Sequence, residues 1–517
     1  TLESFHESFE AAVESVRADL GRFHPHRIEE SDVESESSAA GQESTITVRA
    51  PGDLTLEIGE FAAGDETTVD RAVETAAGAF EEWSKTEYTT RVEIFREAAE
   101  IVRDRKFDLA ATISLENGKN RTEAMADVDE AIDFLRFYAR ELERHEGYRF
   151  DTGRPTPRED TENLLRPYGV FAVIPPFNFP LAILSGMTTG ALITGNTVVL
   201  KPASATPLIA HEFYDVLSDA GLPDGVLTLV TGSGRAVGTP LVEHDSVAGV
   251  AFTGSRSVGV EIQRTFLELG KRGPVIAELG GKNPVIVTDA ADIERAVSGV
   301  AMGAFSFSGQ KCSATSRVYV HEDVMAAFTE RLVAVTESLT VGPPWDRDTV
   351  VSPVIDDDAL SRYEEIVATA RETGTVLTGG STRESASLPR GRYVEPTVVA
   401  DVPHGHVLAR EEHFLPFLTI HPVTDLDEAI RKANDSEYGL CAGIFSEDDR
   451  EVETWFEEIE SGMCYANRDT SATTGALVQA QPFGGWKFSG TTGAFAGGYW
   501  YLPQFMREQS RTRVEAP

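Results

Sequence analysis

From Gly169 onward, short runs of β-branched residues alternate with longer segments that have helical spacing. The first runs are VFAVI, TVVLK, VLTLV, VAGVAF and PVIAEL, between residues 170 and 279. Strands that alternate with helices pair in parallel through right-handed crossovers and carry helices on both faces. A second alternation starts at PVIVTD and continues through RVYVH, VEPTVV and FLTIH, between residues 284 and 421. The sequence therefore predicts an α/β protein with two sheets, the first of the Rossmann type that binds nucleotides.

The segments outside these two alternations have other patterns. Residues 65–146 repeat apolar side chains at intervals of three and four, which predicts helices that cover a sheet. Residues 148–167 are polar and contain prolines, which indicates a linker or an extended ribbon. The late stretch GGYWYLPQFMREQSRTRVE carries aromatic residues. It could pair with that ribbon in a contact between subunits.

The charge of the chain excludes some classes of partner. The formal net charge is −38, from 84 acidic and 46 basic residues, whereas nucleic-acid binding requires basic surfaces. Such an excess of carboxylates repels itself at low salt, but at molar salt the screening length falls to ~3 Å. Only nine lysines stand beside 37 arginines. The composition therefore favours a halophilic cytosol, with an ordinary acidic protein as the alternative.

The sequence contains no run of about 20 apolar residues that would predict a membrane helix, and its acidic start lacks the pattern of a signal peptide. We therefore expect a cytoplasmic protein with no membrane partner. The three cysteines, Cys312, Cys441 and Cys464, are far apart and form no CxxC motif. Neither disulfides nor a metal site is predicted.

One cysteine has the surroundings of a reactive thiol. Cys312 lies in FSFSGQKCSATS, where glycine and small polar residues lead into an apolar strand. A single cysteine is most often a buried small apolar residue, and Cys441 and Cys464, in GLCAGIF and SGMCYAN, fit that description better. Cys312 is therefore the candidate nucleophile.

Two further candidates stand at strand ends. Glu278 is at the end of the apolar run PVIAEL, before two glycines. Partial burial there would raise its pKa and suit a general base, although a capping or ion-paired glutamate is the alternative. Asn178 lies in PPFNFP, a rigid turn after the first strand, where its amide could donate a hydrogen bond to an oxyanion.

Two more strand ends offer contacts for a dinucleotide. The run TVVL is followed by Lys201 and Ser204, and the run VAGVAF leads into a second group made of Thr253, Gly254, Ser255 and Gly259. Neither group is a GxGxxG fingerprint, so each alone is a weak signal.

Together these motifs resemble the aldehyde dehydrogenase superfamily. FNFP, KPAS, FTGS, ELGGKNP, GQKCSA, VEPTV, EEHFLPF and PFGGWKFSG occur in the order and approximate spacing of that family, over about residues 65–509. The resemblance implies a cofactor-binding domain (1–147 and 168–281) and a catalytic domain (282–490). It also implies a β-ribbon arm (148–167 and 491–517) that joins subunits in a homo-oligomer, a dimer or larger.

The resemblance implies a reaction and a role for three of the candidates. The reaction is oxidation of an aldehyde to a carboxylate through a thioester on Cys312, with a nicotinamide cofactor as hydride acceptor. Glu278 would activate the water that releases the acid. Asn178, with the backbone N–H of Cys312, would stabilise the oxyanion. A catalytically silent binding protein of the same fold is the alternative, although nucleophile, base and amide are all present.

The cofactor contacts follow in the same way. The resemblance implies that Lys201 and Glu395 hold the riboses, that Ser255 contacts the pyrophosphate, and that Phe414 packs beside the nicotinamide ribose. NAD is the expected cofactor. Because a serine at position 204 leaves room for a 2′-phosphate, use of NADP remains open.

Within the superfamily, GQKCSATSRVYV and TGALVQAQPFGG are most similar to 1-pyrroline-5-carboxylate dehydrogenases, which oxidise L-glutamate γ-semialdehyde to L-glutamate in proline degradation. This resemblance implies that Ser313, Gly475 and Ala476 bind the substrate carboxylate, since small residues let backbone N–H groups approach it. An ordinary glycine turn is the alternative. Phe495 departs from the family pattern, so succinate semialdehyde, 2-oxoglutarate semialdehyde or a general aldehyde stays open as the substrate.

Overall fold

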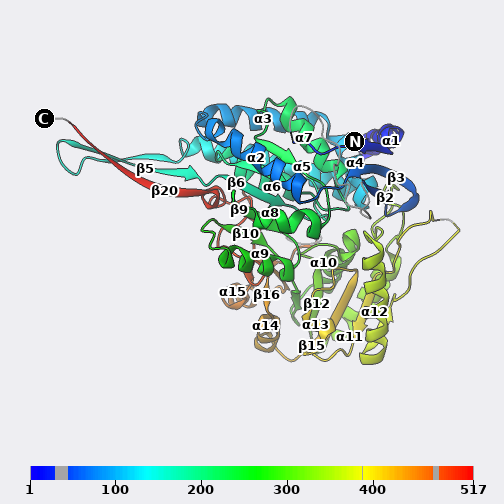
Figure 1. The fold of residues 1–517 in the computed structure, drawn as a ribbon. Coiled ribbons are helices and arrows are strands. Elements are labelled where there is room, and N and C mark those ends of the chain that lie inside the picture. Colours follow the sequence, from blue (N-terminus) through cyan, green and yellow to red (C-terminus); the bar gives the residue numbers. More distant parts are fainter. Residues whose placement is uncertain (1, 29–44, 387, 470–476, 516–517) are drawn as a thin grey trace.

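The computed structural model describes the chain except for residues 1, 29–44, 387, 470–476 and 516–517. Two α/β units lie one above the other, and a long ribbon projects from the upper unit (Figure 1). The predicted α/β class, with a Rossmann-type parallel sheet, is confirmed. Within the described ranges, no helix is both long and apolar enough to cross a membrane.

The first sheet has five parallel strands in the order β10-β9-β6-β7-β8. They are β6 (Val170–Ile174), β7 (Thr197–Leu200), β8 (Leu227–Leu229), β9 (Val247–Thr253) and β10 (Val275–Glu278). Each of the first five predicted runs forms one of them, because β-branched residues suit a sheet that is covered on both faces. The chain leaves β6 towards β7 and β8 and then returns to the other side at β9. Ligands of such sheets bind at the carboxyl ends of the strands, where the order reverses.

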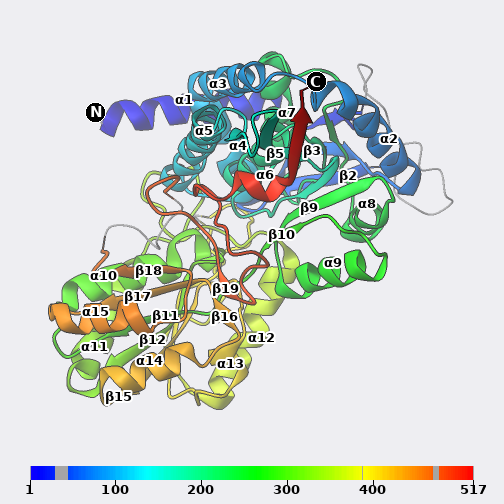
Figure 2. The ribbon, with the colours of Figure 1, turned by 90° about the vertical axis from the view of Figure 1, so that its left-hand side faces the viewer.

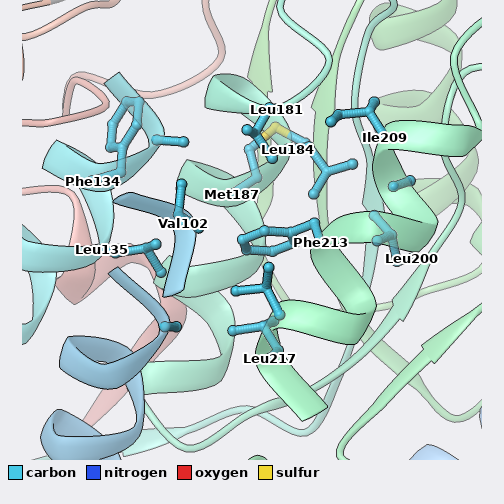
Figure 3. Close-up of a cluster of buried hydrophobic side chains, with 14 of the residues drawn as sticks. Val102, Phe134, Leu135, Leu181, Leu184, Met187, Leu200, Ile209, Phe213 and Leu217 are labelled. Carbon is cyan, nitrogen blue, oxygen red and sulfur yellow. The ribbon is translucent and has the colours of Figure 1, made fainter. Parts of the chain in front are cut away.

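Helices cover both faces of this sheet (Figure 2). On one face lie α3 (Tyr88–Asp104), α4 (Lys106–Asn117), α5 (Arg121–Arg144), α6 (Ala182–Ile193) and α7 (Leu208–Asp219). Figure 3 shows part of their shared core, where Phe213 and Leu217 of α7 lie opposite Met187 of α6 and Val102 of α3. The other face is covered by α2 (Glu66–Trp83), α8 (Thr239–Glu243) and α9 (Arg256–Glu268).

The second sheet has seven strands in the order β13-β14-β15-β12-β11-β17-β18, all parallel except the pair β13–β14. The strands are β11 (Asn283–Val287), β12 (Thr315–His321), β13 (Thr375–Thr378), β14 (Thr397–Ala400), β15 (Phe417–Val423), β17 (Cys441–Phe445) and β18 (Met463–Ala466). The helices of this unit are α10 (Ile293–Phe305), α11 (Glu322–Ser338), α12 (Asp357–Thr373), α13 (Val407–Arg410), α14 (Leu426–Asn434) and α15 (Asp449–Glu458).

Smaller sheets complete the fold. Helix α1 (Leu2–Asp19) precedes a three-stranded sheet of β1 (Arg22–His24), β2 (Thr45–Ala50) and β3 (Asp53–Ala62). Strands β16 (Tyr438–Gly439) and β19 (Trp486–Lys487) form a short pair. The projecting ribbon consists of β4 (Arg149–Gly153), β5 (Glu159–Pro167) and β20 (Met506–Val514). The late aromatic stretch therefore does continue into a strand that pairs with the ribbon after Tyr148, within the same chain.

Candidate active site

The candidate nucleophile follows a tight turn at the amino end of β12. Cys312 comes three residues after the 3₁₀ turn η2 (Ser306–Gly309), in which Phe307 and Ser308 adopt left-handed φ angles of 48° and 54°. Non-glycine residues rarely take this conformation, and each costs about 1–3 kcal/mol. Hydrogen bonds hold the turn: the Ser308 hydroxyl donates to Ser352 O, and the Gln310 amide donates to Phe307 O at 3.3 Å.

Asn283, the first residue of β11, fixes the segment around Cys312. Its amide donates to Cys312 O at 2.7 Å and to Ala314 O at 2.9 Å, and its carbonyl oxygen accepts from Cys441 N at 3.0 Å. The backbone N–H of Cys312 makes no hydrogen bond to any residue that the structure describes. That N–H is therefore available for an oxyanion, and its predicted role in the oxyanion hole stays a prediction.

Cys312 is buried, with 8% of its surface exposed. Burial raises the pKa of its thiol, and the nearby carboxylates of Glu412 and Glu278 raise it further, while the backbone N–H of Ser313 lowers it. Within this structure the sulfur is a protonated thiol at neutral pH. Reaction as a nucleophile therefore requires a group that takes the proton away.

Glu278 is positioned to do so. It ends β10 beside Thr253, which ends β9, and both line the same cavity as Cys312. Burial raises the pKa of its carboxyl well above the ordinary value, although the backbone N–H of Gly485 opposes this by donating to it. Its Oε2 has no hydrogen-bond partner among the described residues. A buried carboxyl with a free oxygen and a raised pKa is suited to general base catalysis.

The cavity at Cys312 has a volume of about 50 Å³. Its walls are mostly aromatic and apolar, and the predicted substrate residue Ser313 is part of them. Other lining residues are Phe134, Phe179, Met187, Phe483 and Tyr501. Such a small, largely apolar space suits the aldehyde end of a small substrate.

Asn178 lies in the turn after β6, where the strand order of the first sheet reverses. It is 2% exposed, and its side chain makes no hydrogen bond with the part of the chain that the structure describes. Its neighbour Phe179 lines the Cys312 cavity, and the ring of Phe177 packs edge-on against Phe414 at 5.8 Å. A buried amide with unused donors next to this cavity fits the predicted oxyanion role.

A second cavity, of about 360 Å³, opens at the carboxyl end of β7. Lys201 lines it, is 4% exposed, and donates from Nζ only to Pro202 O at 3.0 Å. Burial lowers the pKa of this amine to about 8. A buried ammonium that has no carboxylate partner in the described ranges fits a ligand with several hydroxyl or phosphate oxygens, such as the ribose of NAD.

The start of α9 borders the same cavity. Ser255 caps this helix, its hydroxyl accepting from Val258 N, and Gly254 precedes it. The free N–H groups of such a helix start attract phosphate. A side chain at Gly259 would meet Leu279 at 2.3 Å, so glycine lets α9 pack closely beside the end of β10. Thr253, predicted to bind cofactor, faces the Cys312 cavity.

The remaining cofactor candidates lie in different places. Phe414 has a left-handed φ of 59° and contacts Phe177, next to Asn178. The exposed Ser204 donates to Gly232 O at 3.2 Å. Glu395 precedes β14, and its backbone oxygen accepts from Tyr363 at 2.7 Å. It lines neither the Cys312 cavity nor the Lys201 cavity, so its role stays a prediction.

Two acidic residues that sequence reasoning missed lie at the site. Glu412 accepts from Gly281 N at 2.9 Å, and among the charged groups it raises the pKa of Cys312 the most. Glu130, from α5, lines the Cys312 cavity. Burial and the neighbouring Asp127 raise the pKa of Glu130 to about 8. The predicted substrate residues Gly475 and Ala476 lie outside the described residues.

This arrangement can be compared with known proteins. The model of the aldehyde dehydrogenase family matches residues 38–510. The chain belongs to the aldehyde dehydrogenase family. It is 40% identical to a 1-pyrroline-5-carboxylate dehydrogenase of Geobacillus thermodenitrificans, over 99% of this chain and 96% of that protein. It is 38% identical to 1-pyrroline-5-carboxylate dehydrogenase 2 of Bacillus subtilis, over 98% and 95% of the two chains.

Solved structures of family members agree. A crystal structure of 1-pyrroline-5-carboxylate dehydrogenase from Thermus with bound NAD superposes with a TM-score of 0.92 at 34% identity, covering 98% of this chain and 96% of that chain. The predicted family and fold class are therefore confirmed. The predicted likeness to 1-pyrroline-5-carboxylate dehydrogenases is confirmed too.

Proposed function

We propose that this aldehyde dehydrogenase oxidises L-glutamate γ-semialdehyde, the open form of 1-pyrroline-5-carboxylate, to L-glutamate with NAD. The observation that carries the proposal is the shared cavity of Cys312, Glu278 and Glu130. In that cavity the three residues would act as the nucleophile, the base and the carboxylate that binds the substrate amine. The full-length similarity to 1-pyrroline-5-carboxylate dehydrogenases supports it.

The chain's own residues supply the first half of the reaction. Glu278 takes the thiol proton, directly or through one water, because both groups line one cavity and Oε2 is free. The Cys312 sulfur then attacks the aldehyde carbon. The negative charge that develops on the aldehyde oxygen is stabilised by Asn178 and by the free N–H of Cys312.

The second half requires an acceptor and water. When NAD is bound, its nicotinamide supplies the acceptor for the hydride that leaves the aldehyde carbon. The product on the enzyme is a thioester of Cys312. After Glu278 has released the thiol proton to solvent, it removes a proton from water, and the hydroxide adds to the thioester carbonyl. The C–S bond then breaks, the carboxylic acid leaves, and the proton held by Glu278 returns to the Cys312 sulfur. Lys201 and Ser255 would hold the cofactor. Because Glu395 lines neither cavity and Glu412 lies near enough to Cys312 to raise its pKa, we propose Glu412 instead of Glu395 as the carboxylate near the nicotinamide end of the cofactor.

The substrate's amino-acid end also has partners. Glu130 faces the cavity with a pKa of about 8, and an ammonium group beside it would favour its ionised form. Ser313 lies next to the nucleophile and offers a hydroxyl to the carboxylate. Neither succinate nor 2-oxoglutarate semialdehyde carries an amine, so Glu130 distinguishes the substrates.

The test compares purified protein and its Glu130→Gln variant in molar KCl, with 1-pyrroline-5-carboxylate and succinate semialdehyde as substrates. We expect the parent to prefer the first substrate in kcat/KM, and the variant to lose at least about tenfold with it, as for a lost charge-assisted pair, while changing little with succinate semialdehyde. Equal losses with both substrates would refute the role of Glu130. A parent preference for succinate semialdehyde would refute the proposed substrate.

Two controls separate catalysis from folding. Cys312→Ala should abolish oxidation while it keeps NAD binding, measured by quenching of tryptophan fluorescence. An inactive parent that still binds NAD would instead support a binding protein. Replacing NAD by NADP tests whether Ser204 admits a 2′-phosphate.

We also propose that the ribbon joins subunits and that the protein works in the cytoplasm. Phe150 and Val514 on the ribbon are 44% and 59% exposed, and apolar side chains on a projecting arm favour burial against a second copy. A reducing cytoplasm would keep Cys312 as a thiol. Light scattering of the parent and a Phe150→Ser, Val514→Ser variant tests the arm, because a variant with unchanged mass would contradict it.

A further inference from the structure

One face of α5 carries three acidic residues that reach different parts of the active site. Glu123, Asp127 and Glu130 are spaced by four and three residues, which places them on one side of a helix. Glu123 pairs with Lys311, the residue before Cys312. Glu130 lines the Cys312 cavity. Asp127 is completely buried between them.

Asp127 forms a buried ion pair with Lys119. The distance between Lys119 Nζ and Asp127 Oδ2 is 2.6 Å, and both side chains have 0% of their surface exposed. The second carboxylate oxygen, Oδ1, accepts from the backbone N–H of Ala182 at 2.6 Å. Ala182 is the first residue of α6, directly after the turn that holds Asn178. The carboxylate therefore anchors the end of the asparagine turn.

Lys119 contacts an aromatic ring near each half of the predicted oxyanion hole. Its ammonium lies over the ring of Phe179, 3.5 Å from the centroid, and faces the ring of Phe307 at 5.3 Å. Phe179 follows Asn178, and Phe307 belongs to the left-handed turn that leads to Cys312. Cation–π contacts strengthen when both partners are removed from water.

A third contact joins the same elements. The Asn117 side chain donates to Phe177 O at 3.2 Å and accepts from Lys119 N at 2.9 Å. The turn between α4 and α5 is thus attached to the residues on both sides of Asn178. The turn that leads to Cys312 and the turn that holds Asn178 therefore both contact the ammonium group of Lys119.

We propose that the Lys119–Asp127 pair is a positioning element that sets the distance between Asn178 and the backbone N–H of Cys312. Neither Lys119 nor Asp127 lines the Cys312 cavity itself, so the pair acts on the site through Phe179, Phe307 and Ala182. This inference rests on the proposed function only in that Cys312 and Asn178 carry the chemistry. Displacements of about 1 Å in such a site can lower rates about 100-fold.

The test uses the double variant Lys119→Met, Asp127→Asn. Methionine fills the space of the lysine, and asparagine keeps an oxygen that can accept from Ala182 N, so no unpaired charge remains buried. Neutral replacements of a buried pair often preserve stability. The double variant therefore separates the contribution of the pair to folding from its contribution to geometry.

Four quantities are measured in the full-length protein: kcat and KM for aldehyde oxidation, the melting temperature, and the rate of Cys312 alkylation by iodoacetamide. Alkylation displaces iodide and creates no oxyanion, whereas attack on an aldehyde does. We expect kcat to fall at least tenfold, with KM, melting temperature and alkylation rate near those of the parent. A matched control, Glu81→Gln with Lys85→Met, removes an exposed pair at the carboxyl end of α2 and should change none of them.

Either of two results would overturn the proposal. One is a double variant with kcat within twofold of the parent. The other is a loss of alkylation as large as the loss of kcat, which would mean that the sulfur itself is displaced. If the double variant does not fold, Phe307→Leu removes one contacted ring and leaves the ion pair intact. That variant should also lose kcat and keep alkylation. A parent that oxidises no aldehyde would refute the proposed function instead, before any variant is compared.

Discussion

Replacing Glu278 by glutamine should separate the two halves of the reaction. Glutamine keeps the shape of the side chain and can still accept from the N–H of Gly485, but it cannot take a proton from water. A positioned general base contributes about 10²- to 10⁴-fold, equivalent to about 3–5 kcal/mol in the barrier of thioester hydrolysis. Glu278 is 9% exposed and its Oε2 has no other described partner, so bulk water does not replace it easily.

The assay is rapid mixing of enzyme, NAD and 1-pyrroline-5-carboxylate, with NADH followed by absorbance. The variant should give a burst of NADH close to the concentration of sites, followed by slow turnover, and its thioester should be trapped by hydroxylamine. Because the same carboxyl also takes the thiol proton in our scheme, the burst rate should fall as well. It should fall less than steady turnover, which depends on Glu278 for the activation of water. A burst rate reduced as much as turnover would refute the assignment of Glu278 to deacylation.

The pH dependence follows from the same residue. Burial raises the pKa of Glu278, and only its ionised form accepts a proton. Steady turnover of the parent should therefore rise with pH through that raised pKa and then level off. In Glu278→Gln this rise should disappear, because the base that removes the proton from water is gone. A variant with the parental pH profile would show that another group titrates.

Three more outcomes are expected. Asn178→Ala should lower kcat by about 10²- to 10³-fold, as for the loss of one oxyanion donor, without a change in the NAD dissociation constant measured by fluorescence titration. Asn283→Ala removes the amide donor to Cys312 O and Ala314 O; at about 1–3 kcal/mol for each buried group, urea denaturation should show a loss of about 2 kcal/mol or more. With a net charge of −38, the melting temperature should rise between about 0.1 and 2 M KCl, because the screening length falls from about 10 Å at 0.1 M to about 3 Å at 1 M and the carboxylates then repel one another less. An unchanged melting temperature would contradict adaptation to salt.

Much of the fold could be predicted because the strongest patterns coincide with the buried sheet. VFAVI becomes β6 without a shift of either end, since all five residues are apolar and a glycine and prolines bound the run. The pattern of residues 65–146 does not show where one helix ends and the next begins. RDRKF contains good helix formers, yet α3 and α4 are divided at Arg105, whose backbone angles are φ −95° and ψ 11°. Strand β17 was missed, because CAGIF mixes small residues with few β-branched ones.

The candidate site could be predicted where chemistry and chain position coincide, as at Cys312 and Glu278. Glu130 could not, because its function depends on which side of α5 faces the cavity. A signal was present: Glu130 stands one turn before Phe134 and three positions after Asp127, on the side of the helix that holds buried residues. Carboxylates at such positions are costly unless they are paired or used. Glu412 was missed because its contact with Gly281 joins segments that are distant in sequence.

The pairing of β5 with β20 has a consequence for how the protein is made. Nine residues of β20 pair with β5, yet more than 300 residues separate the two strands in the chain. During synthesis both α/β units can collapse before β20 leaves the ribosome, and such long-range pairing forms slowly. The ribbon is then the last element to close. A nascent chain would fold its catalytic apparatus first and complete the arm that we propose for subunit contact only after its synthesis has passed residue 514.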